Sequence, residues 1–211
     1  MKVLLYCGIL ISISFFFSIL PHHSDYYKEN KNYLFILSHQ SELQNGDLIF
    51  RKGRSLESRI VLLTDGETEY SHVGLIYLHK GKPYVIHAVP IESGEKDEFI
   101  KMQSLEDFLS NENAAKFAVY RVADSLHNTS LVASKFVYKC FLKKYSFDDD
   151  YDLKTDNKLY CTELIWKAYK HAGIDLVKGR LCNLNFILVS KKIIVPSSII
   201  KSKLLKKIYS N

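Results

Sequence analysis

The first twenty residues constrain the chain most, because they set aside a segment that is unsuited to an ordinary globular core. One lysine at position 2 is followed by 18 residues, from Val3 to Leu20, that carry no charge. Such a run is typical of an export signal or a membrane anchor. At about 1.5 Å per helical residue it would span roughly 27 Å, barely a bilayer core, so its length does not separate the two.

This segment defines the expected organisation of the chain. We expect residues 1–23 to be the signal or anchor, residues 24–42 a linker with a short helical part, and residues 43–211 one folded domain. The protein is therefore expected to be exported to the cell envelope or periplasm, either anchored by its N-terminal segment or released from it.

Positive charge is concentrated at the C-terminal end. The formal net charge is +6, and residues 176–211 contain eight Lys or Arg and no Asp or Glu. A basic tail of this kind favours contact with an anionic membrane surface or an acidic wall polymer, and it is also typical of a solvated face. The sequence has no zinc-ligand Cys/His pairs and no phosphate-binding glycine loop, so it contains no recognisable nucleic-acid module.

Apolar periodicity beyond residue 42 predicts an α+β domain, with a small antiparallel sheet packed with helices. Apolar residues make up 47% of the chain and aromatic residues 13%, which is ample for one core. The expected strands are residues 48–50, 72–78, 84–89 and 117–122, and the expected helices are residues 55–64, 104–109, 130–144 and 161–172.

The four cysteines, at positions 7, 140, 161 and 182, lack the paired short spacings of metal sites. Cys140 falls on the apolar stripe of its helix, which favours a place in the core. A disulfide between Cys140 and Cys182 is left open. Cys161 begins a helix, where unpaired N–H groups and the helix dipole lower a thiol pKa. Cys161 is therefore the candidate nucleophile, and the alternative is a structural core cysteine.

Two histidines on the predicted hairpin offer the proton acceptor that a cysteine nucleophile needs. If a two-residue loop at Lys80–Gly81 closes the hairpin, paired positions sum to 161. His72 then lies opposite Val89, and His87 is its diagonal neighbour on the same face, within reach of a hydrogen bond between the rings. Two adjacent imidazoles suit a base and the group that orients it.

Four short motifs follow one another along the chain between residues 43 and 175. They are Gly46-Asp47-Leu48-Ile49-Phe50, Ser71-His72-Val73-Gly74, His87-Ala88-Val89 and Tyr160-Cys161-Thr162-Glu163-Leu164-Ile165. In this order they resemble the motifs of the circularly permuted NlpC-type papain-like cysteine hydrolases, the YiiX and YaeF group. The permutation is visible because histidine precedes cysteine, whereas ordinary papain-like enzymes have cysteine first. The resemblance implies the permuted papain-like fold.

The resemblance also implies roles for individual residues. Cys161 would be the nucleophile, His72 the general base and His87 the residue that orients His72, at a position where several relatives carry Glu. Glu163 is equally consistent with a first-turn acid favoured by the helix dipole, and Tyr160 with core packing. Substrate contacts are implied for Tyr160, Glu163, Tyr151 and Asp148, although Phe147 departs from the family's Tyr-Asp-x-x-Phe stretch.

The resulting prediction is a cysteine amidase or peptidase that cleaves a peptide or cell-wall amide bond through a thioester, with no metal or organic cofactor. Two alternatives remain. One is a lipid acyl hydrolase or acyltransferase of the lecithin retinol acyltransferase type, and the other is a catalytically inactive binding protein of the envelope. The expected partners are therefore a peptide, cell-wall or lipid-linked substrate and an anionic membrane surface.

Overall fold

The structure is a computed structural model that describes residues 30–90, 99–186 and 189–211. The predicted signal or anchor at 1–23 lies outside these residues. Within the described ranges, no helix is both long enough and apolar enough to cross a membrane.

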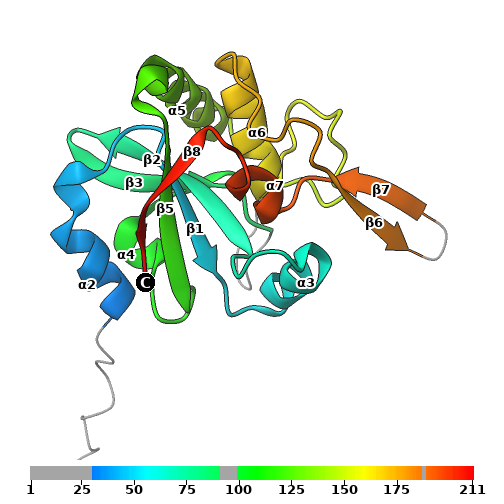
Figure 1. Cartoon of the computed structure of the whole chain (residues 1–211), viewed down its shortest axis with the longest axis horizontal. Helices are drawn as coiled ribbons and strands as arrows, with labels where there is room; N and C mark the ends of the chain where they lie inside the picture. Colours follow the sequence, from blue (N-terminus) through cyan, green and yellow to red (C-terminus); the bar gives the residue numbers. More distant parts are fainter. Residues whose placement is uncertain (1–29, 91–98, 187–188) are drawn as a thin grey trace, which may run out of the picture.

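A six-stranded antiparallel sheet forms the centre of the fold (Figure 1), in the order β4-β3-β2-β1-β5-β8. The pairing of Leu75 with Ile86 and of His79 with Lys82 confirms the hairpin register predicted from the two-residue loop. Both loop residues have positive φ, 51° at Lys80 and 78° at Gly81, as a tight hairpin turn requires. The strands of this sheet are β1 (Leu48–Lys52), β2 (His72–His79), β3 (Lys82–His87), β4 (Lys101–Ser104), β5 (Lys116–Val122) and β8 (Leu205–Ser210).

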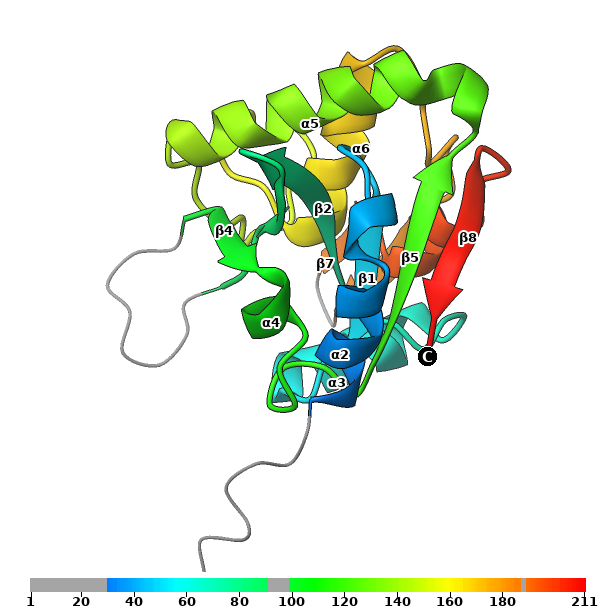
Figure 2. The same ribbon diagram turned by 90° about the vertical axis from the view of Figure 1, so that its left-hand side faces the viewer.

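Helices cover both faces of the sheet (Figures 1 and 2). On one face, α5 (His127–Leu142) and α6 (Cys161–His171) bury the larger core cluster, which includes Val73 and Leu164. On the other face, α2 (Lys31–Ser38) and α4 (Leu105–Phe108) close a second cluster around Ile36, Ile76 and Phe108. The remaining elements are the helices α3 (Leu56–Asp65) and α7 (Pro196–Ile200), and a separate hairpin of β6 (Cys182–Phe186) and β7 (Val189–Ile193).

The ends of the domain differ from the expectation. Part of the predicted linker at 24–42 is the helix α2, and its Ile36 is 0% exposed within the second cluster, so this part packs as core. The basic C-terminal stretch is likewise structural, because its strand β8 pairs with β5 at one edge of the sheet. Lys206 and Lys207 on β8 are exposed, and such lysines discourage pairing of an edge strand with another chain.

The Gly46-Asp47 motif anchors β1 against its surroundings. Gly46 has φ +90°, and a Cβ there would lie 2.6 Å from the Cβ of Ser130 on α5, so only glycine allows this close approach. Asp47 is 1% exposed and accepts two hydrogen bonds of 2.7 Å from the Arg121 guanidinium. This bidentate pair ties the start of β1 to β5.

Candidate active site

Cys161 begins helix α6, and the residues on either side of it are bound to Ile194. The Tyr160 hydroxyl accepts a hydrogen bond of 2.9 Å from the Ile194 N–H, and the Thr162 hydroxyl donates one of 2.7 Å to the Ile194 carbonyl. Tyr160 and Thr162 are 3% and 2% exposed. These two bonds hold the first turn of α6 in place. Tyr160, predicted to contact substrate, therefore sits in the core, as its structural alternative required.

The thiol of Cys161 experiences opposing influences. The backbone N–H groups of Val73, Thr162 and Cys161, together with the Arg51 guanidinium, favour the thiolate. Burial opposes them and is the larger influence, so the pKa of Cys161 is raised. The sequence-based expectation of a lowered pKa is thus wrong in its direction, because helix-terminal N–H groups do not offset the loss of water around the sulfur.

His72 and His87 lie side by side, as the hairpin register predicted. His72 Nε2 is 2.8 Å from His87 Nδ1, and the two rings are nearly perpendicular with centroids 5.0 Å apart. His87 Nε2 is in turn 2.8 Å from Oε1 of Gln103 on β4. Because Oε1 only accepts, His87 carries its proton on Nε2, and His87 Nδ1 accepts a hydrogen bond from the His72 Nε2–H. His72 Nδ1 is then left as the basic nitrogen.

Both imidazoles are held neutral. Burial, followed by the charge of Arg51, lowers the pKa of His87 to about 3. The same two causes, with a smaller contribution from His87, lower the pKa of His72 well below its usual value. Arg51 is paired with His72 in the β1–β2 register, and its guanidinium lies 4.5 Å from the centre of the Phe108 ring. The site therefore consists of neutral bases beside a buried cation.

Gly74 makes room for the histidine pair. A Cβ at this position would lie 2.3 Å from Cγ1 of Val85 and 3.2 Å from Cβ of His87. Any larger residue would push β3 or the His87 side chain away from His72. This close packing gives the Ser71-His72-Val73-Gly74 motif a physical reason for its glycine.

Helix α6, which begins at Cys161, packs against strand β2, which begins at His72. The N–H of Val73, the residue that follows His72 in β2, is close enough to the sulfur to favour the thiolate. In the described part of the chain, no hydrogen bond joins the sulfur to the His72 ring. Contacts of this kind are commonly loose in a substrate-free site and tighten when substrate binds.

The segment at 147–152 borders the nucleophile. Asp148 is 1% exposed, and its carboxylate accepts hydrogen bonds from the N–H groups of Asp150 (3.1 Å) and Asp152 (2.6 Å). These bonds hold a turn in which Tyr151 adopts φ 52°, a conformation that is strained for a tyrosine. Burial and then the Cys161 charge raise the pKa of Tyr151, which places its phenol near the thiol. Of the predicted substrate contacts, half-buried Tyr151 thus lies beside the nucleophile. Buried Asp148 holds the turn that carries Tyr151.

Glu163 is fully buried. It is 0% exposed, and its Oε1 lies 3.1 Å from the Lys167 ammonium one turn along α6. Burial raises the pKa of Glu163 to about 7 despite this ion pair. Glu163 therefore does not line a pocket in this structure, and its place in the first turn of α6 matches the structural reading.

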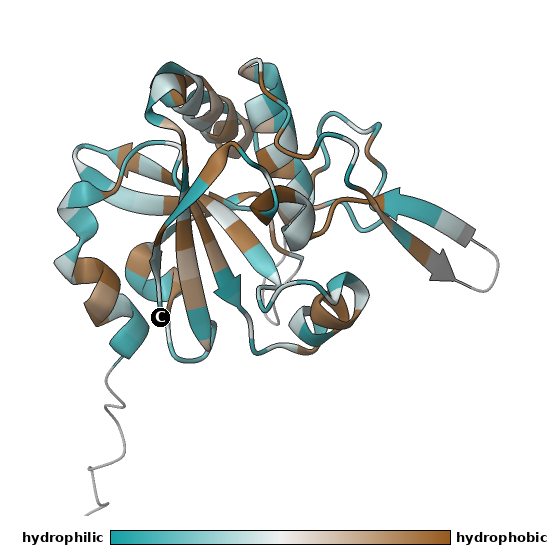
Figure 3. Ribbon diagram, in the orientation of Figure 1, coloured by the Kyte–Doolittle hydropathy of each residue, from teal (hydrophilic) through white to brown (hydrophobic). Residues whose placement is uncertain are grey.

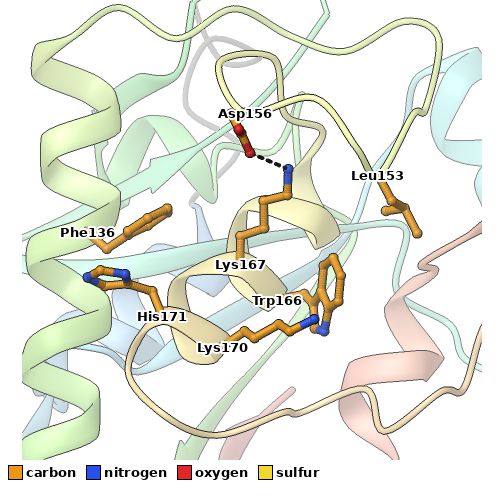
Figure 4. Close-up of a pocket in the computed structure, with 7 residues that line it drawn as sticks. All are labelled: Phe136, Leu153, Asp156, Trp166, Lys167, Lys170 and His171. Atoms are coloured by element: carbon orange, nitrogen blue, oxygen red, sulfur yellow. Dashed lines mark ion pairs between the residues drawn. The ribbon is translucent and has the colours of Figure 1, made fainter.

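Two pockets in the described part of the chain lie away from the histidine pair. The larger, of about 390 Å³, is on the outer side of α6 (Figure 4), and the second, of about 310 Å³, lies between α5 and α6. Neither is lined by Cys161, His72 or His87. The larger hollow is lined by Phe136, Leu153, Asp156, Trp166, Lys167, Lys170 and His171.

The disulfide between Cys140 and Cys182, which the sequence left open, is not formed in the structure. Cys140, Cys161 and Cys182 are all free thiols. Cys140 is 2% exposed within the core, as its apolar stripe predicted, and burial raises its pKa to about 11. Two residues of the site were missed by the sequence reasoning: Arg51, which directly follows the apolar residues of its strand motif, and Gln103, on a strand that was not predicted.

A family of known proteins matches most of the chain. The family model described as permuted papain-like amidase enzyme, YaeF/YiiX, C92 family, matches residues 42–209. The uncharacterized protein YiiX of Escherichia coli K12 is 29% identical over 134 residues, which are 61% of this chain and 58% of that protein. The match thus spans less than two thirds of that relative's length.

A solved structure shares the fold. The crystal structure of the metalloprotein YiiX from Escherichia coli O157:H7 superimposes with a TM-score of 0.65 at 21% identity, over 80% of this chain and 97% of that one. In the ranges described for the present chain, no group of three or more His, Cys, Asp or Glu side chains is placed to hold a metal ion.

Proposed function

The chain belongs to the family of permuted papain-like amidases, and we propose that it is a cysteine hydrolase that cleaves an amide bond through a thioester at Cys161. The observation that carries the proposal is the hydrogen-bonded series His72, His87 and Gln103, and the residue after His72, Val73, has an N–H that favours the Cys161 thiolate. A base with a fixed tautomer beside a helix-terminal thiol is the arrangement that nucleophilic catalysis requires.

The electrostatics favour a neutral resting pair. Because the pKa of Cys161 is raised and that of His72 is lowered, the resting site holds a thiol and a neutral imidazole. The sulfur therefore attacks the amide carbon as its proton passes to His72 Nδ1. His87 Nδ1 accepts the hydrogen bond from His72 Nε2 throughout and keeps the ring in place.

The remaining steps use the same groups. The N–H of Cys161, at the start of α6, is placed to bind the oxyanion, and the nearby Arg51 charge favours the negative intermediate. The C–N bond then breaks, and His72 returns its proton to the departing amine. Water attacks the thioester with His72 again taking a proton, which releases the carboxylic acid and restores the thiol.

The test is to trap the acyl group on the enzyme. The full chain is incubated with peptide amides, with cell-wall fragments and, in parallel, with phospholipids, and intact-protein mass spectrometry follows the mass added to the chain. We expect an acyl adduct that is lost in Cys161→Ala and kept in Cys182→Ala, the matched control at another partly exposed thiol. If the adducts formed with all of the substrate classes are still present in Cys161→Ala, the proposal is overturned.

Substitutions separate the roles of the imidazoles. His72→Ala removes the proton acceptor and should abolish turnover, whereas His87→Ala only loosens its orientation and should reduce turnover less. His87→Gln or His87→Glu should restore part of the loss, because either side chain can accept the His72 ring proton. Equal loss in both alanine variants without rescue would show that His87 is the base or a purely structural residue.

The cellular location of the reaction is proposed from the N-terminal sequence. The uncharged run at 3–20 supports a location in the cell envelope, where peptide, cell-wall and lipid-linked amides occur. Hydrolysis of a lipid acyl bond is the second candidate function. This second candidate is favoured by Leu56 and Leu63, which are exposed on helix α3.

A further inference from the structure

Helix α3 presents an apolar face to solvent. Leu56, Ile60 and Leu63 are spaced at i, i+4 and i+7 and therefore share one side of the helix. They are 68%, 56% and 85% exposed, and none of them belongs to either core cluster. Figure 3 shows the apolar colour on α3 where the helix stands apart from the sheet. A folded chain rarely leaves such a stripe uncovered without a partner.

The apolar stripe continues beyond the helix. The Cys182 sulfur lies 3.6 Å from the carbonyl oxygen of Thr64 near the end of α3, and the preceding residue, Leu181, is 36% exposed. Four of the eight large hydrophobic residues that are exposed in the described ranges are thus gathered on and beside α3. The clustering distinguishes this patch from the isolated exposed residues that any protein carries.

The patch borders the candidate active site. Ser58 in the first turn of α3 and Ser71, which precedes His72, would both collide with a Cβ at Gly53. Glu57 and Cys161 both act on the Tyr151 phenol and raise its pKa. The first turn of α3 therefore lies at the same rim as Tyr151 and the nucleophile.

Two exposed arginines border the patch. Arg54 and Arg59 are exposed, and Arg59 is one turn from Leu56 on one side and from Leu63 on the other. No carboxylate among the described residues forms an ion pair with either arginine. The adjoining chain from residue 176 onward contains no Asp or Glu.

The acidic groups of the same region are largely engaged elsewhere. Asp65 is buried and accepts a hydrogen bond from the Ser197 N–H, while Glu67 is paired with Lys201 at 2.7 Å. Glu57 is the exposed acid that remains on the helix. An apolar stripe bordered by cations is complementary to a bilayer with anionic headgroups, because the bilayer supplies both an apolar interior and negative charge. An acidic soluble protein supplies the negative charge without that apolar interior.

We propose that α3 is an interfacial helix that docks the protein on an anionic phospholipid surface. Leu56, Ile60 and Leu63 enter the boundary between headgroups and acyl chains, and Arg54 and Arg59 contact the headgroup phosphates. Docking in this way turns the rim that holds Tyr151 and Cys161 toward the bilayer, so substrates carried by the membrane are the ones presented to the site. The docking itself is independent of the proposed amide hydrolysis.

The depth of α3 can be measured in the full chain. Trp166→Phe removes the chain's single tryptophan, and Leu63→Trp then places a fluorescent reporter on the apolar face. The matched control is Leu142→Trp in the same background, because Leu142 is 61% exposed at the end of α5, on the other side of the molecule (Figure 2). Both proteins carry residues 1–23, so any tethering by that segment affects them equally.

The reporters are mixed with vesicles of phosphatidylcholine and phosphatidylglycerol whose acyl chains are brominated. We expect severalfold stronger quenching at Leu63→Trp than at Leu142→Trp, and a loss of that excess in Arg54→Glu/Arg59→Glu or in vesicles of phosphatidylcholine alone. Ile60→Trp is a second reporter on the same face and should behave like Leu63→Trp.

Two results would overturn the docking proposal. One is equal quenching at the α3 and α5 positions. The other is a blue shift of Leu63→Trp emission that grows with protein concentration in vesicle-free buffer, which would show that a second copy of the chain covers the face. Neither readout depends on turnover, so the docking proposal and the proposed hydrolase activity can fail separately.

Discussion

Replacement of Glu163 by glutamine should stabilise the fold at high pH and leave it nearly unchanged at low pH. The pKa of this buried carboxyl rises from 4.5 to about 7 on folding. Between these values the folded state holds a proton that the unfolded state has released. Stability is therefore fully present below the unfolded pKa and is lost as the pH rises through the folded one.

The magnitude follows from the shift. At about 1.4 kcal/mol per pKa unit, ionisation of Glu163 costs the folded protein about 3 kcal/mol above neutral pH. Glu163→Gln avoids this cost, and the attraction between the ionised carboxylate and Lys167 is already included in the pKa of about 7. The stability difference between the variant and the wild type should thus grow by about 2.5 kcal/mol between about pH 5 and about pH 8.

Urea unfolding of both proteins at these two pH values measures the effect. Other titrating groups, including the buried histidines, contribute equally to both proteins and cancel in the difference. Glu106→Gln is the matched control, because Glu106 is exposed on α4 and its replacement should give a difference that does not change with pH. A flat difference for Glu163→Gln as well would refute the buried, neutral carboxyl.

Three further outcomes are expected. Arg121→Ala leaves the buried Asp47 carboxylate without its bidentate partner and should lower the free energy of unfolding by about 3 kcal/mol in a urea titration. Because the pKa of His87 falls to about 3 on folding, the wild type should lose up to about 1.4 kcal/mol per pH unit from this group as the pH falls below about 6.5, and the acid unfolding of His87→Gln should be shallower. Removal of Met1–His23 should leave cooperative thermal unfolding intact, as followed by circular dichroism, since the described fold begins at residue 30.

The hairpin that carries His72 and His87 was predictable because its geometry is local. A two-residue loop at Lys80–Gly81 fixes which residues pair, and strand periodicity then decides which side chains share a face. His72 and His87 could therefore be placed together before any tertiary contact was known. Cys161 was predictable for a similar reason, since a turn of helix begins where the apolar spacing of 3.6 residues begins.

Gln103 and Arg51 could not be found in this way. Gln103 reaches His87 because β4 pairs with β3 in a register that puts Gln103 opposite Val85, and the connection that sets this register is long. Arg51 faces the site because β1 lies beside β2, two strands that are separated along the chain by α3. Non-local pairing depends on the whole sheet, and a single strand does not reveal its neighbour.

By itself, the sequence determined the local elements, the register of one hairpin and the order of the motifs, because turns and helix starts depend on residues that are close together in the chain. The tertiary structure alone decided what surrounds each group. It buried the Cys161 thiol enough to raise its pKa, sealed Glu163 beneath the site, and left the apolar stripe of α3 outside both core clusters. Periodicity shows that a helix has an apolar side, whereas burial and desolvation depend on which distant segments pack against that side.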